Sequence, residues 1–216
     1  MTRGPMTQAA TVPALKEWGA VVHALLAGRQ SVLLRKGGIG EKRFEVAARE
    51  FMFFPTVAHS HAERVRPECR DLLTAAAGDS AENRVLVRAA AKVVAALPVN
   101  RPDNIDAIED LHIWTAQSVR EDRLDSRPKH RLAVLVVAAI PLVEPVELPR
   151  MPDYAGCTSW VQLPVRPSLG TPVQDEAALR RVADRVRDAV GKGWPATRLR
   201  SLVDQYRAVR PVSEGT

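Results

Sequence analysis

The chain has 216 residues, of which 46% are hydrophobic and 26% are charged, and its formal net charge is +6. These proportions are typical of a globular protein and exclude a fibrous or low-complexity chain. A chain of this length also buries enough apolar surface to fold without disulfide or metal staples.

The positive charge is unevenly distributed along the chain. Lys and Arg outnumber Asp and Glu by eight to four from Arg29 to Arg66 and by nine to five from Asp175 to Arg210. Because a local excess of positive charge raises the encounter rate with phosphates, this distribution favours a nucleic-acid partner. The alternative is an arginine-rich surface that only keeps the protein soluble.

The sequence indicates neither a membrane segment nor a disulfide. The longest apolar run, Leu132 to Val143, is interrupted by Pro141 and is too short to cross a bilayer. The first residues lack the apolar core of a signal peptide. Cys69 and Cys157 form no C-x-x-C pair, which favours a reducing compartment. We therefore expect a cytoplasmic protein with no membrane partner.

The first predicted elements are a helix and a strand, which follow a disordered tail at residues 1–12. Pro13 occupies the favoured first turn of the helix, and Gly28 ends it. Apolar side chains recur at helical spacing at Leu15, Trp18, Val22 and Leu25. The β-branched and aliphatic segment Ser31 to Lys36 predicts the strand, and Gly37-Gly38 predicts the turn after it.

In the middle of the chain, extended and helical segments alternate. The predicted elements are a strand at residues 51–54, a helix at 67–77, a helix from Pro102 with Asp103 as its N-cap, and a strand at 112–119. Residues 84–97 fit a helix by their alanines, but their valines are bracketed by charges. We favour a strand there.

The last part of the chain divides into the end of a domain and an appendage. Residues 132–140 are apolar at successive positions and predict a central strand, and residues 156–163 predict the last strand. Residues 13–163 thus form one predicted α+β domain. Residues 164–174 are a proline-containing linker, and residues 175–216 predict a helical hairpin and tail.

The candidate ligand site is the run Arg35-Lys36-Gly37-Gly38. Glycines in a turn let a ligand approach the backbone closely, and successive amide groups there form an anion-binding nest. The run matches neither a Walker loop nor a dinucleotide fingerprint. Under this interpretation the basic pair binds phosphate, and Thr56 and His59 line the same pocket. An ordinary strand turn with solvated cations is the alternative.

A metal site is a second possible chemistry. His59 and His61 lie on one side of an extended segment, and with Glu17 they would be the ligands of a metal-dependent hydrolase or nuclease. The zinc pattern H-E-x-x-H and the nucleophile elbow G-x-S-x-G are both absent. Histidines that bind no metal are the commoner case in loops. We therefore expect no cofactor, with a divalent metal required only by this alternative.

Four aromatic residues are candidates for stacking on unpaired bases. These are Phe54, Trp114, Tyr154 and Trp160, and each stacking contact is worth ~1–3 kcal/mol where a ring is exposed. Packing in the core is the alternative for most aromatic side chains. Tyr154 lies in a loop beside Pro152 and Gly156, and is the best candidate for an exposed ring.

Five short motifs occur in order along residues 13–163. They are Ala14-Leu15-Lys16-Glu17-Trp18, Leu33-Leu34-Arg35-Lys36-Gly37-Gly38-Ile39, Phe51-x-x-Phe54-Pro55-Thr56-x-x-His59, His112-Ile113-Trp114-Thr115 and Gly156-Cys157-x-Ser159-Trp160-Val161. This combination resembles a bacterial family without assigned activity, domain-of-unknown-function family 1802. The resemblance points to six positions, without giving them roles: Glu17, Arg35, Lys36, Thr56, His59 and Trp114. Some members of the family are similar in context to restriction-type nuclease domains. This implies an accessory role in restriction-modification, with residues 175–210 as the surface for a protein partner.

The opening of the chain carries a second, weaker likeness. A helix ending in Ala27-Gly28-Arg29 and followed by a strand with Arg35 is similar to the start of RNA-binding PUA-like and ASCH domains. Those domains are small, partly open β-barrels with flanking helices. We therefore predict an α+β fold with a mixed or partly open barrel-like sheet, flanking helices and a C-terminal helical hairpin. The leading function is a nucleic-acid-binding module. The alternatives are a metal-dependent hydrolase or nuclease, and an accessory partner of a restriction-type defence system.

Overall fold

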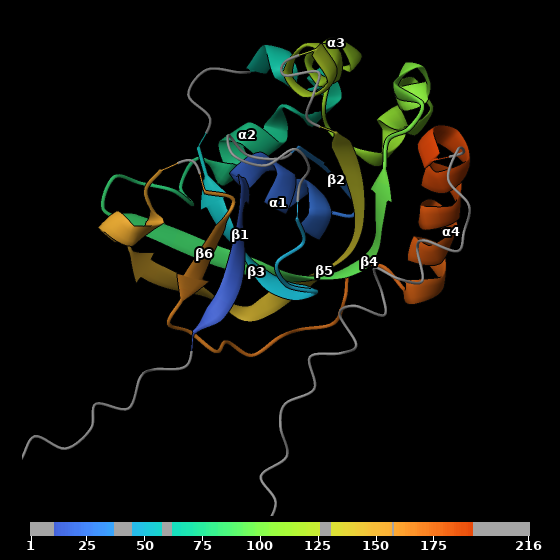
Figure 1. The fold of residues 1–216 in the computed structure, drawn as a ribbon. Helices are drawn as coiled ribbons and strands as arrows, with labels where there is room; N and C mark the ends of the chain where they lie inside the picture. The colour runs from blue at the N-terminus through green and yellow to red at the C-terminus, as the bar shows by residue number, and fades with distance from the viewer. Residues whose placement is uncertain (1–10, 37–44, 58–61, 126–130, 157, 192–216) are drawn as a thin grey trace, which may run out of the picture.

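The fold is α+β, with a six-stranded mixed sheet that curls around the first helix (Figure 1). The structure is a computed structural model that describes residues 11–36, 45–57, 62–125, 131–156 and 158–191. The strands are β1 (Val12–Trp18), β2 (Val32–Lys36), β3 (Glu50–Thr56), β4 (Arg84–Pro98), β5 (Leu132–Pro149) and β6 (Trp160–Leu163). Their order is β2-β5-β4-β3-β1-β6, in which β1 and β3 are parallel and all other neighbours are antiparallel. The open mixed sheet predicted from the sequence is confirmed.

The long pair β4–β5 forms the centre of the sheet. The pairing register shifts between Val87 and Ala89 and again between Val93 and Ala95. Such irregularities bend a strand and increase its twist. The bend allows the sheet to curl around α1 (Gly19–Leu26), which contacts β1, β3, β4 and β5 (Figure 1).

The longer helices cover the sheet from both sides. Helix α1 (Gly19–Leu26) lies within the curve and contacts β1, β3, β4 and β5, while α2 (Asp71–Ala76) packs on α1 (Figure 1). Gly19 is needed at the α1–α2 contact, since an added Cβ would lie 2.9 Å from the Cβ of Ala76. Helix α4 (Glu176–Val186) packs against β4 and β5. The short helical segments are η1 (Ala62–Arg64), η2 (Pro67–Cys69), η3 (Pro102–Leu111), α3 (Ala116–Val119), η4 (Arg120–Asp125), η5 (Pro152–Tyr154) and η6 (Arg187–Gly191).

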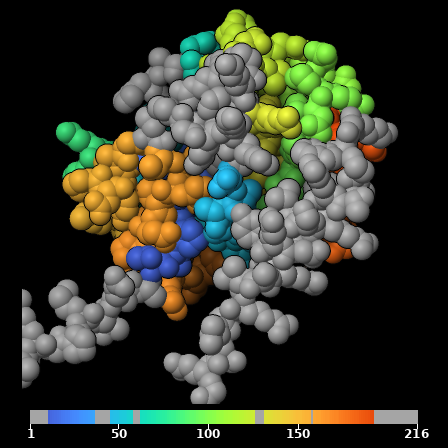
Figure 2. Space-filling view, in the orientation of Figure 1, coloured from blue at the N-terminus to red at the C-terminus, as the bar shows by residue number. Residues whose placement is uncertain are grey.

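Strand β1 is buried on both of its faces, which explains why the helix predicted from Pro13 is wrong. Leu15 belongs to the main hydrophobic cluster, and its neighbour Ala14 belongs to a second cluster on the opposite face. The strand also lies between β3 and β6, and these segments meet side by side at the surface (Figure 2). Pairing on two sides overrides local helix propensity. The apolar residues with helical spacing are therefore divided between strand β1 and helix α1. Gly28 follows the end of α1, as predicted, and has a φ of +69°.

The strand predicted at residues 112–119 is also wrong. Trp114 forms only an isolated bridge with Val65, and the chain then turns into α3. Thr115 is the N-cap of this helix, and its Oγ1 accepts a hydrogen bond from the backbone N–H of Ser118. Such a side-chain cap satisfies an N–H group that the first turn leaves open, which favours helix over strand.

Three other segments differ from prediction in their extent. β5 continues through Pro141 and Pro145 to Pro149, because beyond Val137 its second side borders residues 168–173 and not a strand. Prolines are tolerated at such an edge, where no ladder N–H is needed. The last strand is shorter than predicted and begins at Trp160. The segment from Pro102 is a 3-10 helix with a kink at Ile108, and Asp103 is not its N-cap.

The predicted strands at Ser31 to Lys36, 51–54 and 84–97 are confirmed as β2, β3 and β4, and the helix at 67–77 as η2 and α2. Leu179, Val186 and Val190, from α4 and η6, belong to the same hydrophobic cluster as the sheet. The second helix of the predicted hairpin lies outside the described residues, as does the N-terminal tail up to residue 10.

None of the described helices is long and apolar enough to cross a membrane. Cys69 is buried and carries a free thiol, while Cys157 lies outside the described residues.

Helix α4 begins with a side-chain cap that can be tested. Asp175 accepts a hydrogen bond of 2.6 Å from the backbone N–H of Ala178. Replacing Asp175 with alanine is expected to lower the free energy of unfolding by ~0.5–2 kcal/mol, because this N–H loses its partner. Chemical denaturation followed by circular dichroism measures the change. The control is Asp184→Ala on the exposed face of the same helix, which we expect to change stability by less than ~0.5 kcal/mol. Equal effects of the two would contradict the cap.

Candidate functional site

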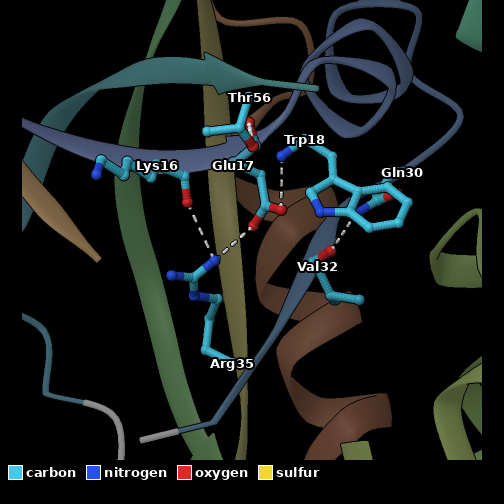
Figure 3. A network of polar contacts seen from close by, with 7 residues as sticks. All are labelled: Lys16, Glu17, Trp18, Gln30, Val32, Arg35 and Thr56. Carbon is cyan, nitrogen blue, oxygen red and sulfur yellow. Dashed lines mark hydrogen bonds and ion pairs between the residues drawn. The ribbon is translucent and has the colours of Figure 1, made fainter. Parts of the chain in front are cut away.

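A buried ion pair joins the first two strands inside the curve of the sheet. The side chains of Glu17, from β1, and Arg35, from β2, are only 6% and 13% exposed. Arg35 Nη1 donates hydrogen bonds to Glu17 Oε2 at 3.0 Å and to the carbonyl oxygen of Lys16 at 3.2 Å (Figure 3). The second carboxylate oxygen of Glu17 accepts a hydrogen bond from the backbone N–H of Trp18 at 2.9 Å. The pair therefore fixes the end of β1, from which Trp18 projects.

Two further polar side chains, Thr56 and Gln30, hold the ends of β1 and β2 near this pair. Thr56, at the end of β3, donates its hydroxyl proton to the carbonyl oxygen of Glu17 at 3.1 Å. Gln30 donates to the carbonyl oxygen of Val32 (Figure 3). It also accepts a hydrogen bond from the backbone N–H of Ile113, the residue before Trp114. The two bonds of Gln30 connect the start of β2 to the segment that carries Trp114.

Trp18 and Trp114 meet edge to face beside this network. Their ring centroids are 4.7 Å apart and the ring planes are inclined by 78°. Trp114 is 4% exposed, whereas Trp18 is partly exposed. Edge-to-face contacts are a favoured arrangement of aromatic pairs. The buried ring thus supports the partly exposed one.

His112 helps to place Trp114. It is 2% exposed, and its Nδ1 accepts a hydrogen bond from the backbone N–H of Trp114 at 3.3 Å. Burial, and then the nearby positive charge of Arg66, lower the pKa of His112 from its ordinary 6.5 to about 4. The imidazole is therefore neutral at pH 7, and Nδ1 is free of a proton and able to accept.

The tryptophan pair forms one wall of a pocket of about 280 Å³. The other lining side chains come from three short segments, and are Arg64, Ser118, Val119, Asp122 and Arg123. Arg64 pairs with Asp122 across 3.3 Å, and the guanidinium carbon of Arg123 lies 5.4 Å from the ring centroid of Trp114. An arginine over the face of a tryptophan is a favourable cation–π contact.

The surroundings of this pocket carry one more positive than negative charge among the described residues. Arg123 interacts electrostatically with Glu17 and Asp122, and also with Arg35 and Arg64. Arg35 and Arg64 face these two carboxylates, whereas Arg123 lies on the tryptophan. Burial is the main cause that lowers the pKa of Arg123, since the charged form loses hydration there. An anionic group beside Arg123 would offset that loss.

A second cavity, of about 370 Å³, shares Arg123 with the first. Its apolar lining includes Val99, Pro102, Leu124 and Leu132, and its polar lining includes Arg131. Arg120 also lines it and pairs with Asp106 across 2.5 Å. Lys36 approaches the same region, because its Nζ donates to the carbonyl oxygen of Leu124 at 3.4 Å.

The structure brings together three of the residues singled out in the sequence, namely Glu17, Arg35 and Thr56, and places Trp114 behind Trp18. Lys36 follows Arg35 on a strand, so the two side chains point to opposite faces, and they contact different segments. Gly37, Gly38, His59 and His61 lie outside the described residues.

The expectation that Tyr154 carries an exposed ring is wrong. The ring is 7% exposed and packs against Phe54, with centroids 5.1 Å apart. Burial raises the pKa of its hydroxyl, as does the negative charge of Asp153. The turn η5 folds the ring back onto the second hydrophobic cluster, away from the tryptophan pocket.

Sequence reasoning missed most of the pocket walls. The apolar spacing assigns Trp18 to the buried stripe of a helix, and nothing in the sequence singles out Arg64, Asp122 or Arg123. They belong to short helical segments that come together only when β2, β4 and β5 are paired. The one signal that could have found the pocket is that Trp18 follows Glu17 directly in the same motif.

A metal cluster is not found in the described part of the chain, where no three His, Cys, Asp or Glu side chains are suitably grouped. Of the alternative ligand set, Glu17 is engaged by Arg35 and by the N–H of Trp18.

Comparison with known proteins gave two solved structures and one family. The structures are two variants of ZmASCH from Zymomonas mobilis, one with a serine replaced by alanine and one with a tyrosine replaced by phenylalanine. Each is 13% identical to this chain and covers 79% of it, and the match spans 94% and 96% of their own chains, with TM-scores of 0.38 and 0.36. A search of curated proteins gave no match.

The family match confirms the resemblance seen in the sequence and extends it beyond residue 163. It runs from residue 14 to residue 185, from β1 through most of α4. The chain therefore belongs to the family described as Domain of unknown function (DUF1802).

Proposed function

We propose that this protein is a nucleic-acid-binding module whose tryptophan pocket accepts an unpaired base. The observation that carries the proposal is the pairing of Trp18 and Trp114 with Arg64 and Arg123 in the lining of one pocket. A base would pack against the exposed part of Trp18, and its phosphate would meet the guanidinium of Arg123. The basic sequence, with a pI near 9.8, supports a polyanionic partner.

The pocket has the chemistry that an unpaired nucleotide requires. Stacking on an aromatic side chain is tolerant of sequence, because every base has a π face. A guanidinium presents a planar fork of donors that matches a phosphate group. The pocket volume of about 280 Å³ lies near the lower end of ligand sites, which is suited to one nucleotide and not to a folded chain.

The glycine turn after β2 has a secondary place in this proposal. Lys36 ends β2 at the cavity that shares Arg123 with the tryptophan pocket, and Gly37-Gly38 follows it directly in the sequence. We propose that the turn adds a phosphate contact next to the pocket. Arg35 would act indirectly in this arrangement, by holding Glu17 and the end of β1.

Two other functions are less well supported by the geometry. A metal-dependent hydrolase or nuclease would need the carboxylate of Glu17 as a ligand, but that carboxylate is engaged by Arg35 and Trp18. An accessory partner in a restriction-type system would need a free docking face on residues 175–210, but the apolar side of α4 packs against β4 and β5.

The proposal predicts that Trp18→Leu weakens binding of single-stranded RNA or DNA by roughly 5- to 150-fold, the value of one stacking interaction. Fluorescence anisotropy with labelled oligonucleotides measures the dissociation constant. Arg123→Gln should reduce the slope of log affinity against log salt, by about 0.7 for each phosphate of a single strand that the variant no longer binds.

The matched control is Arg180→Gln, which removes an exposed arginine on α4 that pairs with Glu176. It changes the net charge by the same amount as Arg123→Gln and should leave affinity and slope nearly unchanged. Trp18→Phe keeps an aromatic face and should retain most of the binding, which separates stacking from loss of folding. Single strands that bind wild type and Trp18→Leu equally well would overturn the proposal.

A further inference from the structure

The two cavities share one arginine, and this determines how a ligand can occupy them. Arg123 belongs to the lining of both the tryptophan pocket and the cavity beside β5. The two volumes, about 280 Å³ and 370 Å³, are each of the size that suits one nucleotide unit. A ligand that filled both would pass its connecting group over the guanidinium of Arg123.

We infer that the two cavities form one track for two successive unpaired nucleotides, with the phosphate between them on Arg123. The inference rests on the proposed function and names the ligand more narrowly, as a single-stranded oligonucleotide of at least two residues. The first base occupies the tryptophan pocket. The second base lies on the apolar side chains of Val99, Leu124 and Leu132.

The charge distribution supports the phosphate at the shared arginine. Arg64 in the first cavity and Arg120 in the second already face carboxylates, at 3.3 Å from Asp122 and 2.5 Å from Asp106. Arg123 lies on the face of Trp114, 5.4 Å from its centroid, and Glu17 and Asp122 act on it electrostatically while they pair with Arg35 and Arg64. A bridging phosphate is the ligand group that such an arginine suits best.

The second cavity has the same net lining charge as the first, because Asp103 and Asp125 offset two of its three arginines, Arg120, Arg123 and Arg131. Two carboxylates there oppose the approach of another phosphate. We therefore expect the affinity to rise from the mononucleotide to the dinucleotide, and to rise less from the dinucleotide to the trinucleotide.

The experiment compares nucleotides of increasing length. Isothermal titration calorimetry with adenosine monophosphate, the dinucleotide ApA, and tri- and tetra-adenylates gives their affinities, and a parallel deoxyribose series distinguishes RNA from DNA. We expect the dinucleotide to bind at least tenfold more tightly than the mononucleotide, because the second contact becomes intramolecular. Arg131→Glu should reduce this ratio, because it places a negative charge in the second cavity and not in the first. Arg131 is exposed and lines only the second cavity.

The control for Arg131→Glu is Arg180→Glu, a charge reversal of equal size on the exposed face of α4. Thermal unfolding of each variant checks that the fold is retained. Equal affinities for the mononucleotide and the dinucleotide, or a ratio that Arg131→Glu and Arg180→Glu reduce equally, would overturn the track and leave the proposed function standing. The absence of binding by any member of either series would overturn both.

Discussion

Replacing Glu17 with glutamine is expected to lower the free energy of unfolding by ~3–5 kcal/mol, a large part of the stability of an ordinary domain. Glutamine keeps the shape of the side chain and an oxygen for the N–H of Trp18, but it removes the negative charge. The guanidinium of Arg35, 13% exposed, then loses the carboxylate that lies 3.0 Å away. Urea denaturation followed by circular dichroism measures the loss as a shift in midpoint at constant slope.

The matched control is Glu147→Gln at the edge of the sheet. Glu147 pairs with Arg84 across 2.7 Å, but their side chains are 60% and 41% exposed. Exposed ion pairs of this kind contribute ~0–1 kcal/mol, so we expect little change. A double variant with methionine at both 17 and 35 should be more stable than Glu17→Gln, because it removes both buried charges. Equal losses for Glu17→Gln and Glu147→Gln would show that the buried pair contributes no more than the exposed one.

Lowering the pH is expected to destabilise the protein through His112. Its pKa is about 4 in the folded chain and 6.5 ordinarily, so the unfolded chain takes up a proton at a higher pH than the folded chain does. The stability that neutral His112 contributes is therefore complete above pH 6.5 and is lost as the pH falls from 6.5 towards 4. A difference of this size amounts to about 3 kcal/mol over the whole window. Denaturation midpoints at half-unit pH steps measure the loss.

The control for this prediction is His112→Asn, which cannot titrate in this range. The asparagine oxygen can take the place of Nδ1 as acceptor for the N–H of Trp114. The carboxyl groups of Asp71 and Asp110 have pKa values lowered by Arg29 and Arg185, so their contribution is lost at the acid end in both proteins. Parallel stability curves for the two proteins between pH 7 and 4.5 would rule out His112 as the cause.

The fold was predictable where burial alone decides the structure. Residues 132–140 are an apolar run buried on both faces and form a strand as predicted, whereas residues 84–97 carry charges among their valines and also fitted a helix. The fold was unpredictable where pairing decides it. Leu15, Trp18, Val22 and Leu25 have helical spacing, yet the first two lie in β1, because partners on both sides supply its hydrogen bonds. A single sequence contains no measure of such distant partners.

The candidate site also contains residues that could be predicted from the sequence and residues that could not. Glu17, Arg35 and Thr56 could be found from the sequence because the motifs of the family resemblance include them, and the structure joins them, although Glu17 was expected in a helix. Arg64, Asp122 and Arg123 could not, because solvated arginines and aspartates have the same appearance in a sequence. Arg64 lies in the connection between β3 and β4, and Asp122 and Arg123 lie in the connection between β4 and β5, and no local pattern specifies how these connections meet. The prediction for Tyr154 was wrong because a proline-rich loop suggests exposure, whereas η5 packs the ring inward.

In the connection between β4 and β5, residues that line the pocket are separate in the chain from those that hold the sheet together. The ion pair that the scaffold requires is held by β1 and β2, while α3 and η4 supply Ser118, Asp122 and Arg123. Substitutions at exposed positions of this connection, such as Gln117 or Glu121, leave the strands and their pairing unchanged. Members of one lineage can therefore diverge in what they recognise while they keep the same framework, and a library confined to the exposed positions Gln117, Glu121 and Asp125 would explore new ligands at little cost in stability.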